Sequence, residues 1–135
     1  MRCLVLSFIF AACVVVAAAV FFVWRGASIS LQAEQTHQAY LVTLDALTVY
    51  VGEHAGNWPK DWRELATAQP KRPSPSFRWP DDLPEFERRV QVDFSVTAAD
   101  VAAMDAANFK AVQPIGANYG TDEVGIERLL QAIRK

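Results

Sequence analysis

Residues 3–24 read CLVLSFIFAACVVVAAAVFFVW, and this stretch decides the fold. Its 22 residues carry no charge, and Ser7 is their one clearly polar side chain. As a helix rising about 1.5 Å per residue, the stretch extends about 33 Å, which matches the hydrocarbon core of a bilayer. We therefore expect a transmembrane anchor over residues 1–25 that is surrounded by membrane lipid. Three residues mark the predicted span: Cys3, Val16 and Trp24.

Two kinds of processing compete with a retained anchor. The small residues Ala17–Ala19 suit a signal peptidase, but the apolar run continues to Trp24, beyond the roughly 7 to 15 residues of a usual signal core. Cys13 is the residue that lipidation would modify, but Phe10 is a poor match three residues before it, and a further apolar run follows. The sequence favours the uncleaved anchor over both alternatives.

The orientation of the anchor follows from the basic residues around it. Arg2 precedes the span and Arg25 follows it, and the next Lys or Arg is Lys60. A segment poor in Lys and Arg is the one that crosses the membrane more readily. We expect a single-pass protein of the inner (cytoplasmic) membrane, with its N-terminus inside and residues 26–135 outside the cytoplasm.

The composition of the chain limits which partners and which kinds of site are possible. The chain has 135 residues, with 13 Lys and Arg against 15 Asp and Glu, so it lacks the basic excess that nucleic-acid binders use on phosphates. We expect no nucleic-acid partner. Residues 26–135 suffice for one modest domain. Both cysteines, Cys3 and Cys13, lie in the predicted anchor, so the domain contains no disulfide and no thiolate metal site.

An amphipathic helix is predicted from Leu31 to Val51. Its polar residues include Asp45, and glycines from Gly52 onward are expected to end it. Gly26 allows either one continuous helix with the anchor or a kink. The apolar residues recur at steps of four, three and four, which is the helical period: Tyr40, Leu44, Leu47 and Val51.

Shorter elements are predicted after this helix. They are a short helix from Pro59 to Ala66, a loop with five prolines over residues 70–84, a strand over Arg88–Val96, a helical turn over residues 100–107, a strand over residues 108–113, and a last helix capped by Thr121. The expected fold class is α+β: an N-terminal transmembrane helix continues into a long amphipathic helix that packs on a small antiparallel sheet, with short helices.

Several features of residues 1–66 occur together in one family. They are the membrane-spanning helix that runs on as an amphipathic helix, then Tyr50, a glycine turn at Gly56, the pair Trp58-Pro59, and Leu65. In these features the chain resembles type IV pilins and type II secretion pseudopilins. The resemblance implies a pilin-like domain over residues 26–135 and helix contacts with other subunits. The family's leader motif for prepilin peptidase is absent from this sequence, and no acid lies in its apolar block.

Motifs for chemistry are sparse. His37 and His54 are the only histidines, and the zinc-protease, nucleophile-elbow and phosphate-loop patterns are all missing. The acids of residues 81–87 suit a solvated loop better than a calcium site, because Arg88 and Arg89 follow directly. We expect no enzyme activity, no metal and no cofactor.

Four large aromatic residues within a short stretch are the candidate partner-binding residues. A short helix and a loop cannot hide this much aromatic surface alone. The first interpretation is that they cap the core beneath the long helix, and the second is that they form an exposed patch for a protein or glycan. They are Trp58, Trp62, Phe77 and Trp79.

Two functional hypotheses follow. The first is a membrane-anchored, non-enzymatic, pilin-like protein of the cell envelope that acts in assembly of a secretion or surface apparatus. Its partners would be other single-span envelope proteins, or a second copy, through the N-terminal helix. The alternative is a stand-alone anchored domain that binds an envelope protein or a ligand through the aromatic residues.

Overall fold

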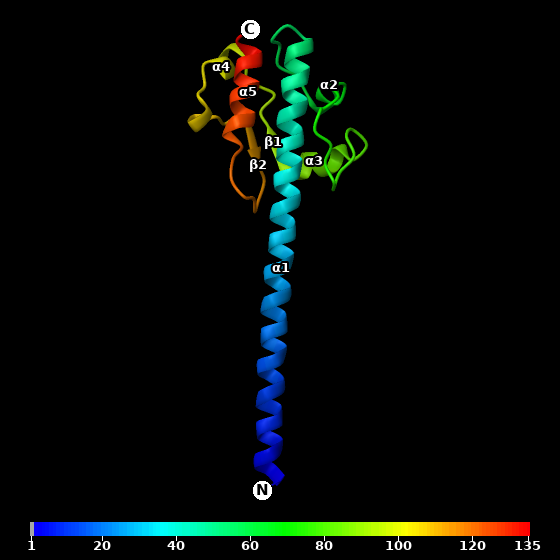
Figure 1. Cartoon of the computed structure of the whole chain (residues 1–135), viewed down its shortest axis with the longest axis vertical. Helices are drawn as coiled ribbons and strands as arrows, with labels where there is room; N and C mark the ends of the chain where they lie inside the picture. Colours follow the sequence, from blue (N-terminus) through cyan, green and yellow to red (C-terminus); the bar gives the residue numbers. More distant parts are fainter. Residues whose placement is uncertain (1) are drawn as a thin grey trace. The chain divides into compact units, whose positions relative to one another are not determined.

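Helix α1, Arg2–Glu53, contains both the apolar stretch and the predicted amphipathic helix (Figure 1). The computed structural model describes residues 2–135, with side chains from Cys13 onward, so the side chain of Cys3 lies outside the described part. Gly26 lies within α1, so the helix continues from the apolar stretch into the amphipathic one. The chain divides into two compact units, Met1–Gln32 and Ala33–Lys135.

The buried face of α1 in the unit Ala33–Lys135 is the one that the helical period predicts. Tyr40, Leu44, Leu47 and Val51 are each at most 2% exposed. The helix ends just after them, where Gly56 has a positive φ of 83° and its N–H donates to the Val51 carbonyl over 2.9 Å. Glycine suits this position because it has no Cβ to clash in the left-handed region.

A two-stranded antiparallel sheet packs against α1. Strand β1, Val90–Val92, pairs with β2, Val112–Pro114, so that Val92 lies opposite Val112. Val90, Val92 and Val112 are buried. The alternating valines therefore place one face of the sheet in the core, as their period of two predicts.

Both strands differ from the sequence prediction in length or position. The predicted strand Arg88–Val96 ends early, because the Asp93 carboxylate accepts hydrogen bonds from the Ser95 N–H at 2.9 Å and the Ser95 hydroxyl at 2.6 Å. This local turn bends the chain before it can pair further. The second strand begins late, because Asp105 accepts from the Asn108 N–H at 2.8 Å and holds the 3-10 helix η1, Ala106–Asn108.

Helix α3, Leu83–Arg89, was not predicted, because its first residues were assigned to the proline-rich loop and its last to a strand. Pro84 lies in its first turn, where a missing N–H breaks no helical hydrogen bond. The last helix, α5, spans Glu123–Ile133 and has Asp122 at its N-cap, so the predicted cap at Thr121 is wrong by one residue.

Two further short helices fall close to their predicted positions. Helix α2, Trp62–Leu65, is capped by Asp61, whose carboxylate accepts from the Glu64 N–H at 2.8 Å. Helix α4, Ala98–Ala102, begins with a capping box in which Thr97 and Asp100 satisfy each other's backbone N–H groups.

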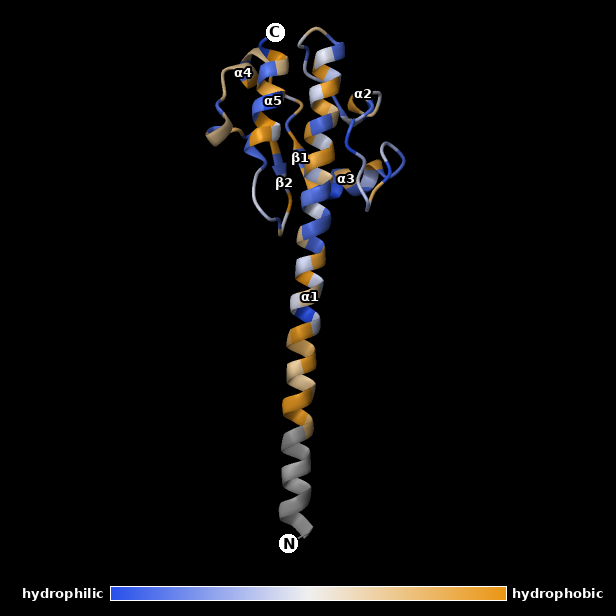
Figure 2. Ribbon diagram, viewed as in Figure 1, coloured by the Kyte–Doolittle hydropathy of each residue, from blue (hydrophilic) through white to orange (hydrophobic). Residues whose placement is uncertain are grey.

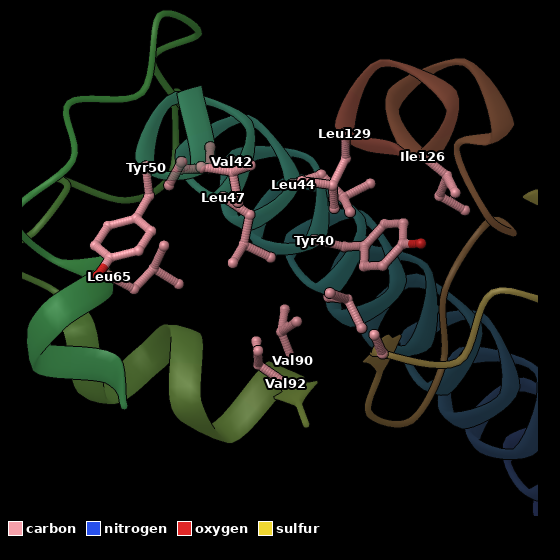
Figure 3. Packing of buried hydrophobic residues seen from close by; sticks show 14 of the residues in the cluster. Tyr40, Val42, Leu44, Leu47, Tyr50, Leu65, Val90, Val92, Ile126 and Leu129 are labelled. Atoms are coloured by element: carbon pink, nitrogen blue, oxygen red, sulfur yellow. The ribbon is translucent and has the colours of Figure 1, made fainter. Parts of the chain in front are cut away.

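The core of Ala33–Lys135 forms where α1 meets the other elements (Figure 3). Figure 3 shows Leu44 and Tyr40 of α1 near Leu129 and Ile126 of α5, while Leu47 and Tyr50 lie toward Leu65 of α2 and the β1 valines. The predicted fold class, α+β with a long helix packed on a small antiparallel sheet and short helices, is confirmed.

Candidate partner-binding surfaces

The first candidate surface is the apolar part of α1. From Cys13 to Leu31 every side chain except the half-buried Ser28 is exposed, and Figure 2 shows hydrophobic colouring over the first described turns of the helix, followed by a mixed stretch. Arg25 is the one charged residue between Cys13 and Ala33. The large apolar side chains are 49–73% exposed: Val14, Val15, Val16, Val20, Phe21, Phe22, Val23, Trp24, Ile29 and Leu31.

This segment has the composition of a membrane helix. A helix that is apolar on all sides avoids water by lying in lipid or among other helices, because exposed apolar surface costs about 25 cal/mol per Å². In its described part, the helix from Cys13 to Glu53 is long and apolar enough to cross a membrane. A signal sequence near an N-terminus passes the same test of composition.

Trp58 and Trp62 lie close to the turn that follows β1. Trp58 is 8% exposed, and its indole N–H donates to the Asp93 carbonyl over 2.9 Å. Trp62 begins α2, is half-buried, and meets the Phe94 ring edge to face at 5.7 Å. Both tryptophans therefore cover the core on this side of the unit.

Phe77 and Trp79 form a separate group around Phe86 of α3. Phe86 is fully buried, and the centroids of Phe77 and Trp79 lie 5.5 and 5.0 Å from its ring. The Trp79 indole N–H donates to the Ala68 carbonyl over 2.8 Å, and the Arg89 guanidinium lies 5.4 Å from the Phe77 centroid. Their inner faces belong to the core, and both rings stay half-exposed.

The structure thus divides the four aromatic residues into two groups, each packed on its own part of the core. This arrangement agrees with the first interpretation of the sequence, in which they cap the core. Partner binding by these residues stays a prediction. It is best placed at Phe77 and Trp79, because these two line a pocket of about 300 Å³ together with Arg72 and Arg78.

Asp45 of α1 organises the loop that carries this pocket, and sequence reasoning missed this role. Its carboxylate accepts hydrogen bonds from the backbone N–H groups of Lys71 and Arg72. Ser74 closes a turn further along, where its hydroxyl oxygen accepts from the Phe77 N–H at 3.2 Å. The sequence marks Asp45 only as a polar helix position, because its partners lie 26 and 27 residues away.

Both histidines and Tyr50 are engaged in local contacts. The ring of His54 stacks on Tyr50 at 4.0 Å, and His37 meets Tyr119 edge to face at 6.1 Å. Burial, aided by the hydrogen bond to Glu64, raises the pKa of Tyr50. Among the residues with described side chains, no three His, Cys, Asp or Glu side chains are grouped to hold a metal ion.

Tyr40 is a strongly perturbed titratable group. Its hydroxyl is buried and has no hydrogen-bond partner in the described part of the chain. Burial, together with the negative charge of Asp122, raises the pKa of Tyr40 to about 12. The phenol is therefore neutral at physiological pH.

A second exposed apolar group lies in the connection between β2 and α5 and in the first turn of α5, and sequence reasoning did not single it out. Ile115, Tyr119 and Val124 are 46%, 57% and 58% exposed. The signal available in the sequence is the uncharged, turn-rich run from Gln113 to Thr121 with two large apolar residues, Ile115 and Tyr119, in it. Comparisons of this chain with protein-family models, curated proteins and solved structures find no match.

Proposed function

We propose that this chain is a membrane-anchored, non-enzymatic, pilin-like or pseudopilin-like protein of the cell envelope that acts in assembly of a secretion or surface apparatus. Residues 1–25 serve as a single-pass anchor in the inner (cytoplasmic) membrane, and the domain lies outside the cytoplasm. The observation that supports this most is the exposed apolar surface of α1, on the same helix whose later turns build the core of Ala33–Lys135.

The anchor also supplies the contact surface for assembly. In lipid, helices associate through close van der Waals packing, which small side chains permit. Ala17, Ala18 and Ala19 lie within the exposed apolar surface, between Val16 and Val20. The expected partners are a second copy or other single-span envelope proteins.

Photo-cross-linking in intact cells tests this proposal. A photo-reactive residue at Val16, which is 61% exposed, should give adducts to the same chain or to other single-span subunits. Glu53, exposed near the end of the same helix, provides the matched control and should give few such adducts. Leu44 is unsuitable as a probe site, because it is only 2% exposed. Monomer alone at both positions would contradict assembly through the anchor.

The alternative function, an anchored domain that binds an envelope protein or ligand, is favoured by one observation. The pocket of about 300 Å³ places two half-exposed aromatic rings, Phe77 and Trp79, beside Arg72 and Arg78. A probe at Ser76 that captures one unrelated envelope protein, combined with an unreactive probe at Val16, would favour this alternative.

A further inference from the structure

The pocket beside Phe77 and Trp79, here called the aromatic recess, combines ring surfaces with cations. It has a volume of about 300 Å³ and is formed mainly by the loop between α2 and α3 (Figure 1). Among the described residues that line it, none is Asp or Glu. Its polar side chains are Gln69, Arg72, Ser74 and Arg78. The walls therefore offer apolar contact area, positive charge and hydrogen-bond donors together.

The two guanidinium groups of the recess are available to a ligand. Arg72 and Arg78 are exposed, and neither side chain forms an ion pair within residues 13–135. Arg72 also lines a smaller neighbouring pocket of about 20 Å³, which Asp45 and Asp122 line as well. Arg78 is therefore the main candidate for an anion in the recess. A guanidinium presents a planar fork of N–H donors, which matches a carboxylate.

Hydrogen bonds within the fold hold the recess in shape. The Trp79 indole N–H donates to the Ala68 carbonyl over 2.8 Å, so the indole offers only apolar surface to a ligand. The hydroxyl oxygen of Ser74 accepts from the Phe77 N–H, and its own hydrogen has no acceptor in the described part of the chain. A recess that is formed before binding needs little further ordering when a ligand enters.

The backbone of this loop offers few donors for a peptide. Residues 70, 73 and 75 are prolines and have no N–H. A peptide that binds as an added strand needs main-chain hydrogen bonds, so the loop favours a compact ligand that is recognised by side chains and rings. Most of the other N–H groups already donate to Asp45, Ser74 or Asp82; they are those of Lys71, Arg72, Ser76, Phe77 and Arg78.

We propose that the aromatic recess binds a carboxylated sugar, which is a hexose ring that carries a carboxylate. The C–H face of the sugar packs on Phe77 and Trp79. Its carboxylate pairs with Arg78, with Arg72 beside it, and a ring hydroxyl accepts from Ser74. The volume of about 300 Å³ lies at the small end of the roughly 300–1,000 Å³ of ligand pockets, which suits a single sugar ring.

This inference goes beyond assembly through the anchor and names a ligand class for the pocket on which the alternative function depends. The recess belongs to the unit Ala33–Lys135, whereas the surface proposed for assembly belongs to Met1–Gln32. Sugar binding and assembly therefore use different residues, and separate variants address them.

NMR of the tryptophan indole N–H groups tests the proposal on the full chain in detergent micelles. The chain has four tryptophans, and Trp79→Phe identifies the signal of Trp79 by its loss. Titration with D-glucuronate or N-acetylmuramate should shift this signal more than the other three. D-Glucose, which has the ring without the carboxylate, and acetate, which has the carboxylate without the ring, should each bind at least about tenfold more weakly, because each loses one of the two kinds of contact.

Substitution of the cations tests the role of charge. Arg78→Gln should raise the Kd of the sugar acids about tenfold, because a charge-assisted hydrogen bond is lost. Arg72→Gln should raise it less, since Arg72 also borders the smaller pocket. Arg63→Gln, at an exposed arginine of α2 that does not line the recess, is the matched control and should leave the Kd unchanged.

Three results would overturn the inference: no shift of the Trp79 signal with either sugar acid, equal affinity for glucose and glucuronate, or an unchanged Kd with Arg78→Gln. A Glu-rich peptide that shifts the Trp79 signal at lower concentration than both sugar acids would also overturn it and would assign the recess to an acidic peptide.

The Val16 probe separates this inference from the proposed function. Adducts from Val16 without sugar binding would refute the ligand of the recess and leave assembly through the anchor intact. Sugar binding that responds to Arg78→Gln, without adducts from Val16, would support the ligand and refute assembly.

Discussion

At the scale of single residues, polar side chains decide where the chain turns and which loops stay fixed. The Asp93 carboxylate ends β1 through its bonds to Ser95, and these bonds lower the pKa of Asp93. Asp45 acts over a longer range, because it joins α1 to the loop of residues 69–80 through two backbone N–H groups. Each carboxylate accepts hydrogen bonds from backbone N–H groups that have no backbone carbonyl as a partner. The carboxylate thus takes the place of a water molecule at these groups.

Removal of the Asp45 carboxylate should loosen the loop of residues 69–80. Asp45→Ala should lower the free energy of unfolding by about 1–2 kcal/mol, because two charge-assisted hydrogen bonds at a half-exposed site are lost. Denaturant unfolding of the full chain in detergent, followed by tryptophan fluorescence, measures the change. Glu53→Ala, at an exposed position of the same helix, should stay within about 0.5 kcal/mol of the parent chain. Equal unfolding midpoints for the two variants would contradict the role of Asp45.

Tyr40 should make stability depend on alkaline pH. Its pKa rises from 10.0 to about 12 on folding, so the folded state favours the protonated phenol. This contribution is complete below pH 10 and is lost as the pH rises from about 10 to about 12.

Tyr40→Phe should therefore reduce the loss of stability between pH 10 and 12. At neutral pH the variant should be as stable as the parent chain or more stable, because the hydroxyl is buried without a partner. Unfolding midpoints across this pH range measure the effect, and Tyr119→Phe serves as the exposed control. Identical alkaline slopes for the parent chain and Tyr40→Phe would show that Tyr40 does not cause the loss.

At the scale of elements, α1 has two different environments along one helix. Leu47 is fully buried in the core of Ala33–Lys135, whereas Leu31 is 60% exposed in Met1–Gln32. The same residue type therefore belongs to the core of the domain at one position and stays exposed at the other.

A pair of truncations measures this difference. Leu47→Ala should lower the free energy of unfolding by about 2–5 kcal/mol, since it leaves a cavity among packed side chains. Leu31→Ala should change it by less than about 0.5 kcal/mol. Denaturant unfolding in detergent compares the two variants. Similar losses for both would mean that the exposed part of α1 also supports the domain fold.

Elements with a repeating pattern could be predicted from the sequence, and elements defined by local hydrogen bonds could not. The period of Tyr40, Leu44, Leu47 and Val51 identified the buried face of α1, and alternating valines identified the first strand. Helix α3 was missed because its few residues are too short to show a period and Pro84 resembles loop chemistry. The strand ends were missed because hydrogen bonds to aspartates override the alternation: Asp93 binds Ser95 and ends the first strand, and Asp105 binds Asn108 before the second strand begins.

The candidate site was predicted less well than the fold. The aromatic residues were recognised, but their division into two groups depends on Phe86, in a helix that the sequence pattern did not predict, and on Phe94, in a turn far along the chain from Trp62. The pocket beside Phe77 depends on Asp45, whose partners no local pattern reveals. Contacts between segments distant in sequence leave no periodic signal in either one.

At the scale of the whole molecule, the proposed function depends on whether the apolar N-terminal stretch is retained or cleaved. A retained helix makes this a membrane protein whose domain is held near the bilayer and near other anchored chains. Such tethering raises the effective concentration of neighbouring domains, so weak contacts between them become sufficient. A cleaved stretch would release the domain and remove that advantage.

Intact mass spectrometry of the chain extracted from cell membranes tests this claim most directly. We predict a species that retains residues 3–24. This species should be recovered in the membrane fraction and should resist extraction by high salt. A species that begins after Ala19, found in the soluble envelope fraction, would contradict it, because the surface proposed for assembly would then be absent from the mature protein.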